Sequence, residues 1–319
     1  HKAIRRQRQM CIRDRFKEVF LQRLFFNMSL FMSDQANNLN KVKPKKNYKK
    51  APLMPIHMRV FVAVVLGQIA CGFALGISGT ALSNAARYLI ISDLWTGLIG
   101  AGSLIGLAGS IIIGRISDKF GRRKLLMINM YILGIFSLLQ LLTANFALIF
   151  IIRVIIGLMI AVDYTVGNAL LTEWLPAGED SKRQSHLLIY WTIGFIASYI
   201  TGTFVNGFGS YTWQIILATS AIPAFIAAIF RSIFPLPASP SWLASRGKVK
   251  KANQVIKKHM GRRWGIPKRL KKAKPVKEVT WKILFSKKYL RRTLIGGLFY
   301  ACQAFAFFGI SIFLSLIHI

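Results

Sequence analysis

Seven long apolar segments constrain the fold of this 319-residue chain more than any other feature. Each is dominated by Leu, Ile, Val, Phe, Ala and Gly, and each approaches the roughly 20 residues of helix that cross a bilayer. Runs of this length do not alternate as barrel strands do, so helix is the expected spanning state. We therefore expect an all-α polytopic membrane protein. The segments are 60–82, 94–114, 125–143, 146–168, 187–208, 213–234 and 294–314.

Basic residues alternate with the apolar segments. The chain has 44 Lys and Arg against 10 Asp and Glu, and 42 of the basic residues lie in every second connection. The positive-inside rule then places the N-terminus in the cytoplasm. Charge shared among membrane loops, without interleaved aromatic residues, argues against a nucleic-acid partner. The connections that carry the charge are residues 1–59, 115–124, 182–183 and 231 with 246–292.

The spacing of the segments predicts two bundles. Six helices in 60–234 come first, a long basic loop at 235–293 follows, and 294–319 begins a second bundle that is cut short. Within the loop, Lys248–Met260 and Val279–Leu290 could lie as amphipathic helices on anionic lipid, or form a solvated linker.

Both ends of the chain look foreign. RQRQMCIRDR near the start and LSLIHI at the end resemble adapter read-through, so we expect residues 1–31 to be non-native or disordered. Met32 would then open a basic cytoplasmic tail over 32–59. A charged amphipathic N-terminal helix is the alternative for the first 31 residues.

A glycine-rich basic motif, GRISDKFGRRK, joins the second and third segments over residues 114–124. We expect a tight hairpin loop in which Gly114 permits close helix packing and Gly121 adopts a positive φ. Asp118 could cap backbone N–H groups or face the N-terminus of a neighbouring helix. A simple positive-inside turn is the alternative. The residues expected to hold the loop on the cytoplasmic side are Arg122, Arg123 and Lys124.

This motif resembles the major facilitator signature G-x-x-x-D-[RK]-[FY]-G-R-[RK], and every fixed position is met. The resemblance implies the N-terminal six-helix bundle of that fold, followed by the first helix of the second bundle. It also implies a conformational latch that holds the two halves together while the outward state is populated. The latch residues it implies are Gly114, Asp118, Gly121, Arg122, Arg123 and Glu173.

Further motifs resemble the sugar, phosphate and metabolite porters. The fourth segment holds R-x-x-x-G at Arg153 and then VDYTVGNALLTEWLP, with Asp163 matching a GDYP-like aspartate. LPASPSWLASRGK resembles PESPRWL-x-x-x-GK, with Ala238 and Ser241 in place of Glu and Arg, which weakens that ionic latch. The aspartate of sugar–proton symporters is replaced by Ala74 and that of phosphate porters by Ala304. An inner-membrane metabolite transporter of unassigned solute fits best.

Ionisable groups inside spans are functional candidates by default. Arg153 could hold an anionic solute or pair with a carboxylate elsewhere, and Asp163 could carry a coupled proton. Either residue could instead anchor helices together. On an ideal helix they lie about 15 Å apart, too far to pair. Arg231 near a helix end is expected to snorkel to the interface. Expected cavity-lining residues are Gln68, Asn168, Tyr190, Trp191, Tyr199, Tyr300 and Gln303.

The sequence as a whole predicts a secondary active transporter that moves a small metabolite across the bacterial cytoplasmic (inner) membrane by alternating access. Proton coupling through Asp163 is a hypothesis, and we expect a monomer when complete. A transport-dead sensor is the main alternative. A membrane-embedded enzyme is a weaker one, because the histidines lie at ends or in loops and no G-x-S-x-G motif occurs. We expect no metal and no cofactor.

Overall fold

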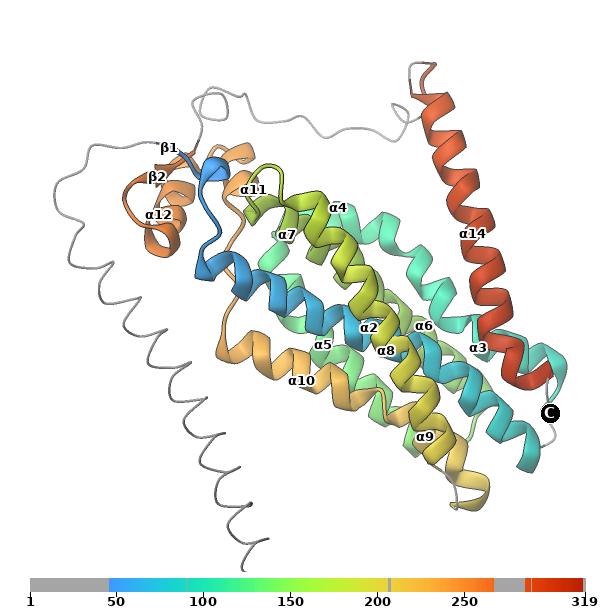
Figure 1. The fold of residues 1–319 in the computed structure, drawn as a ribbon. Coiled ribbons are helices and arrows are strands. Elements are labelled where there is room, and N and C mark those ends of the chain that lie inside the picture. Colours follow the sequence, from blue (N-terminus) through green and yellow to red (C-terminus); the bar gives the residue numbers. More distant parts are fainter. Residues whose placement is uncertain (1–45, 90, 206–207, 267–284, 288, 318–319) are drawn as a thin grey trace, which may run out of the picture.

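A computed structural model describes residues 46–89, 91–205, 208–266, 285–287 and 289–317 (Figure 1). All seven predicted spans are helices long and apolar enough to cross a membrane. The expectations for residues 1–31 and for most of Val279–Leu290 lie outside the described residues. The spans are α2 (Pro55–Tyr88), α3–α4 (Asp93–Ala108, Ser110–Phe120), α5–η2 (Arg122–Leu139, Gln140–Leu142), α6–η3–α7 (Phe146–Val162, Asp163–Gly167, Asn168–Trp174), α8 (Asp180–Phe204), η4–α9–α10 (Gly209–Tyr211, Thr212–Ala218, Ala221–Ile233) and α14 (Leu290–Ile317).

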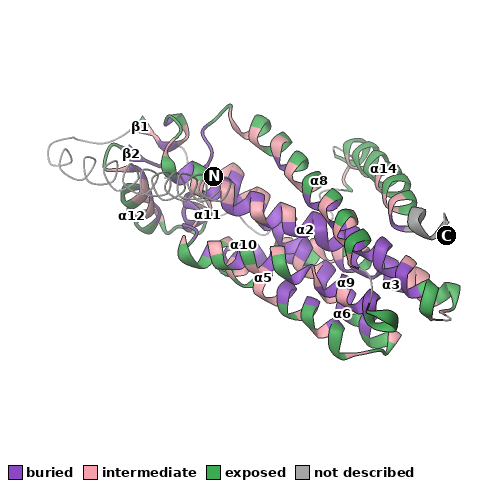
Figure 2. Ribbon diagram, turned by 60° about the horizontal axis from the view of Figure 1, so that its bottom comes forward, coloured by how far each residue is buried: buried purple, intermediate pink, exposed green. Residues whose placement is uncertain are grey.

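Helix α2 forms the centre of the bundle and packs against α8, α9, α10 and α14 (Figures 1 and 2). Glycine lets the backbones of α2 and α8 approach closely. A Cβ on Gly194 would lie 2.1 Å from the carbonyl oxygen of Ile69, and one on Gly72 would lie 2.2 Å from that of Trp191. Helix pairs inside a bilayer commonly associate through such small residues. The outer helices leave Ile and Leu exposed along their free faces, as lipid contact requires.

The glycine of the R-x-x-x-G motif has a packing role. A Cβ on Gly157 would lie 2.0 Å from the carbonyl oxygen of Ser103, so α6 can meet α3 only without a side chain there. Gly106 on α3 makes the reciprocal approach to the carbonyl oxygen of Val154, at 2.0 Å from its own ideal Cβ. These contacts hold α6 close against α3 next to Arg153, which lies four residues before Gly157.

The predicted hairpin loop at 115–124 is wrong in extent. Helix α4 continues through Phe120 and α5 begins at Arg122, so the turn is the single residue Gly121. Its φ of 93° confirms the predicted positive φ. Close packing at Gly114 is not found, because no described atom lies within 4 Å of a Cβ placed there. The loop is short because both helices can extend beyond the hydrocarbon without losing backbone hydrogen bonds.

A compact cap covers the end of the bundle that carries this turn. It consists of β1 (Lys46–Asn47), η1 (Tyr48–Lys50), α11 (Pro240–Ser245), α12 (Val249–Met260) and β2 (Trp264–Gly265). β1 and β2 pair in parallel, so the segment before the first span is joined to the segment after the sixth. Helix α12 turns Ala252, Ile256 and Met260 inward. The predicted helix at Lys248–Met260 is therefore found, but its apolar residues pack into the protein core of the cap, where the prediction had them on lipid.

Candidate transport site

An ion pair lies in the interior of the bundle. Nη2 of Arg231 on α10 lies 2.6 Å from Oδ1 of Asp163 on η3, and neither side chain is exposed. The expectation that Arg231 snorkels to the interface is therefore wrong. Its side chain points to the inside of the bundle, where a carboxylate and backbone carbonyls are available.

The guanidinium of Arg231 is saturated with acceptors. Nε and Nη2 donate to the carbonyl oxygen of Ala63, at 3.2 and 3.0 Å, and Nη1 donates to that of Leu126 at 2.9 Å. Nη1 also donates to Oδ1 of Asn129, whose Nδ2 donates to Asp163. One buried cluster thus ties together α2, α5, η3 and α10. Charges withdrawn from water persist when paired and hydrogen-bonded in this way.

Gly67 on α2 makes room for the pair. A Cβ at this position would lie 2.2 Å from Nη2 of Arg231 and 2.2 Å from Oδ2 of Asp163. That Oδ2 has no hydrogen-bond partner among the described residues. The Asp163 carboxylate is therefore hydrogen-bonded through Oδ1, and its Oδ2 lies against the α2 backbone at Gly67.

Arg153 is equally buried but poorly satisfied. Its Nη1 reaches the carbonyl oxygen of Ala74 at 3.4 Å, while Nε and Nη2 have no partner among the described residues. The structure thus places Arg153 beside the position where the resembled symporters carry aspartate. Asp163 is engaged by Arg231, in keeping with the expectation that it cannot pair with Arg153. A buried guanidinium left so unsatisfied needs an explanation, which makes Arg153 a functional candidate.

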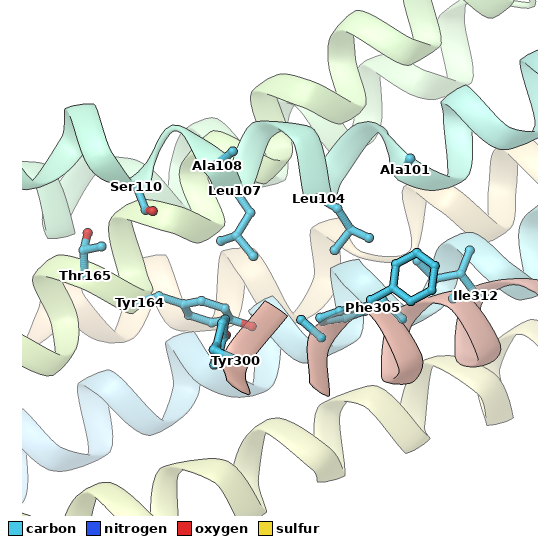
Figure 3. A pocket seen from close by; sticks show the side chains of 13 residues that line it. Ala101, Leu104, Leu107, Ala108, Ser110, Tyr164, Thr165, Tyr300, Phe305 and Ile312 are labelled. Carbon is cyan, nitrogen blue, oxygen red and sulfur yellow. The ribbon is translucent and has the colours of Figure 1, made fainter. Parts of the chain in front are cut away.

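A cavity of about 600 Å³ lies between α3–α4, η3 and α14 (Figure 3). Its η3 wall is a π-helical turn, a feature often found at functional sites. The walls are largely apolar, and the tyrosine, threonine and serine residues supply hydroxyl groups. The lining residues are Ala101, Leu104, Leu107, Ala108, Ser110, Tyr164, Thr165, Tyr300, Ala304, Phe305, Phe308, Gly309 and Ile312.

Aromatic side chains connect this cavity to α8. Trp191 Nε1 donates to the hydroxyl of Tyr164, a cavity residue. The Trp191 ring stacks on Phe195 with centroids 5.2 Å apart and meets Phe308 edge-on at 6.4 Å. The Tyr199 hydroxyl donates to the carbonyl oxygen of Ser311 on α14. The fourth and seventh spans are thus linked to α8 around one aromatic cluster.

Only some of the residues that the sequence predicts to line a cavity lie at this one. Tyr300 lines the cavity, and Trp191 contacts two of its walls. Gln68 and Asn168 each keep a buried amide atom without a partner in the described chain, Nε2 and Oδ1 respectively. Tyr190 packs edge-on against Phe61, with ring centroids 6.2 Å apart. Gln303 is exposed on α14 and does not line the cavity.

Three of the predicted latch residues meet at the capped end of the bundle. Arg122 forms an ion pair with Glu173 at the end of α7, through Nη1 and Oε1. Its Nη2 lies 3.6 Å from Asp118, whose carboxylate side chain is 66% exposed. The backbone oxygen of Asp118 accepts hydrogen bonds from Trp242 Nε1 at 2.8 Å and Arg246 Nη2 at 2.6 Å, both on or next to α11. Arg123 is exposed.

Sequence reasoning missed the inward turn of Arg231 and, apart from Tyr300, most of the cavity residues of η3 and α14. The signal for Arg231 was present, because the sixth span carries this basic residue and the fourth span carries an acid, Asp163, that needs a counter-charge. Tyr164, Thr165 and Phe308 gave no separate signal, because a π-helical turn cannot be seen in hydrophobic periodicity. Among the described residues, His, Cys, Asp and Glu form no group of three that could hold a metal ion.

Known proteins match the chain along most of its length. The family described as "Sugar (and other) transporter" matches residues 27–315. The putative metabolite transport protein YaaU of Escherichia coli is 28% identical over 274 residues, which cover 85% of this chain and 60% of that protein. The inner membrane metabolite transport protein YgcS of the same organism is 28% identical, covering 81% of this chain and 57% of that protein.

Solved structures show the same fold. The proton:xylose symporter XylE, of the major facilitator superfamily, superposes with a TM-score of 0.57 at 23% identity, covering 65% of this chain and 50% of that one. This chain thus spans about half to three fifths of the length of these relatives. The match over residues 27–315, the motif at the α4–α5 turn and the helical architecture lead to one conclusion. The chain is a member of the sugar (and other) transporter family, and it shares the fold of a major facilitator structure.

Proposed function

We propose that the complete protein is a secondary active transporter that moves a small metabolite across the bacterial inner membrane by alternating access. The observation that carries this proposal is the cavity between the first bundle and α14. Transporters of this kind bind their solute near the midplane, where two structural repeats meet, and rock one repeat against the other. Helix α14 is the first helix after the basic loop, so its wall of the cavity belongs to the second repeat.

The proposed orientation places the cap and the N-terminus in the cytoplasm. The turn at Gly121, helix α12 and the segment before α2 all carry clustered Lys and Arg at one end of the bundle. Such clusters mark the cytoplasmic side of membrane proteins. The relatives extend beyond the matched part, so we propose that transport requires that further length of chain.

The solute-facing residues follow from the geometry. We propose that Tyr164 and Tyr300 offer hydroxyl groups to the solute, while Phe305 and Phe308 pack against its apolar faces and Trp191 supports Tyr164 from behind. Relatives named as a D-xylose transporter and an arabinose-proton symporter support a small hydroxylated metabolite as the solute class. The alanines at 74 and 304 argue against assuming the solute or the coupling of those relatives.

Proton coupling remains a proposal in which Asp163 and Arg231 act as one unit. Proton uptake at Asp163 has to break its ion pair with Arg231. The single variant Asp163→Asn would leave that arginine without its counter-charge, so its loss of function would be ambiguous. The double variant Asp163→Asn/Arg231→Gln removes both charges together and keeps hydrogen-bonding side chains.

The test is flux in proteoliposomes that hold the full-length transporter. A radiolabelled panel of pentoses and hexoses is followed with and without an imposed proton gradient. Saturable uptake supports transport, and its absence across the panel with a correctly folded protein would favour a sensor. With Asp163→Asn/Arg231→Gln, we expect proton-driven accumulation to be lost and solute exchange to survive. Retained accumulation would place the coupling elsewhere.

A further inference from the structure

The segment before the first span is built into the capped end of the bundle (Figure 1). Tyr48 is only 1% exposed, although it lies in a stretch rich in lysine. Its hydroxyl donates to the carbonyl oxygen of Glu173 at 3.3 Å, and the Ser241 hydroxyl lies 2.7 Å away and can donate to it. Burial raises the pKa of Tyr48, so the hydroxyl stays protonated and remains a donor.

Lys49 completes the contact with the end of α7. Its Nζ donates to the carbonyl oxygens of Thr172 at 2.5 Å and Leu175 at 2.9 Å. Its own carbonyl oxygen accepts from the backbone N–H of Ala177 at 2.8 Å. The last carbonyls of a helix lack intrahelical partners, and lysine is well suited to supply them. Two adjacent residues therefore clamp the last turn of the fourth span.

That same helical turn carries Glu173, the partner of Arg122. The resembled porters have an arginine at the position of Ser241, and here the serine hydroxyl meets Tyr48 instead. Because Tyr48 joins α11 to the end of α7, it fixes where Glu173 stands relative to the turn at Gly121. Trp242 and Arg246 hold the other side of that turn through the Asp118 carbonyl oxygen.

We propose that Tyr48 and Lys49 are positioning residues of the latch, which hold Glu173 against Arg122 and take over from the ionic contact that Ser241 cannot make. This proposal rests on the proposed transport function, because a latch matters only if the protein alternates between states. The clamp then stabilises the outward state, the state in which the resembled family closes its latch.

The expected size follows from one buried hydrogen bond. A net contribution of about 1 kcal/mol corresponds to about a fivefold change in a two-state equilibrium. Tyr48→Phe removes only the hydroxyl and keeps the buried ring, so the fold should be preserved. It should lower the ratio of outward to inward state about fivefold. Ser241→Ala removes the same contact from the other side and should act in the same direction.

The experiment measures outward exposure directly in the full-length transporter without native cysteines. Ala101 lines the cavity at the opposite end from Ser110, from which α4 runs toward the turn at Gly121 (Figure 3), so Ala101→Cys reports access from outside through its rate of reaction with an impermeant maleimide. Because labelling follows the outward fraction, we expect Tyr48→Phe to slow it by up to about fivefold. The double variant Tyr48→Phe/Ser241→Ala should label no slower than Tyr48→Phe, because Tyr48→Phe already removes the contact with Ser241.

Tyr131→Phe is the matched control. The Tyr131 hydroxyl lies 2.8 Å from the Ser232 hydroxyl, the same pair of groups, but it is exposed and joins α5 to α10 with no contact to Glu173. It should leave the labelling rate unchanged. Labelling of Tyr48→Phe and Ser241→Ala at the parent rate, in folded protein, would overturn the proposal. Labelling does not require a known solute, so absent flux in the parent would refute the transporter alone.

Discussion

Replacing Arg231 by methionine should strand Asp163 as an unpaired charge in the centre of the bundle. The substitution keeps a long side chain but removes five hydrogen bonds from the guanidinium, two of them to the Ala63 carbonyl oxygen. Neither member of the pair is exposed, so water cannot replace those bonds without opening the bundle. Breaking a buried pair on one side costs about 3–5 kcal/mol.

Thermal unfolding of the purified protein in detergent measures this cost. For a domain of 150–250 residues, each kcal/mol lowers the midpoint by about 2–4 °C, so Arg231→Met should melt about 6–20 °C lower. Adding Asp163→Asn removes the stranded charge and should recover at least half of that loss. Neutralising both partners of a buried pair is often close to neutral in stability.

Arg183 offers a matched control. Its Nε lies 3.7 Å from Oε2 of Glu179, and the glutamate side chain is 38% exposed. Pairs of this kind are worth about 0–1 kcal/mol, so Arg183→Met should shift the midpoint by less than about 4 °C. The reasoning fails if Arg231→Met melts no lower than Arg183→Met. It also fails if the double variant is as unstable as Arg231→Met.

Three further outcomes are expected. Single cysteines at Tyr88 and Gly209 should react with an impermeant reagent outside intact cells and one at Val249 should not, because we propose that the cap is cytoplasmic; labelling at Val249 would reverse the topology. Asp118→Asn should slow transport and leave membrane insertion intact, because its exposed carboxylate adds little stability, and unchanged flux would remove its latch role. Burial lowers the pKa of His259 below the unfolded value, with nearby basic residues contributing, so cap stability should fall as pH drops below about 6.5. Melting between pH 7.5 and 5.5 should show this loss, and His259→Gln should reduce it.

The sequence alone was enough to predict those features that depend on a short stretch of residues or on their summed hydrophobicity. The length of each apolar segment is sufficient to predict the seven spans. Every segment must cross the same thickness of hydrocarbon, and its backbone groups must form their hydrogen bonds without water. The positive φ at Gly121 also follows from local chemistry, since glycine adopts it without strain. The motifs that identify the family are likewise short and contiguous. Each of these features depends on residues that are neighbours in sequence.

Tertiary structure alone decided which charges meet. Asp163 and Arg231 are 68 residues apart, and Tyr48 and Ser241 are 193 apart, so neither contact follows from periodicity. Near a helix end, an arginine can reach the interface or turn inward, and the choice depends on which acceptors the packed neighbours present. Here Gly67 left the space and Asp163 supplied the charge. The cavity and the clamp on α7 arise in the same way, from packing between helices that only the folded chain brings together.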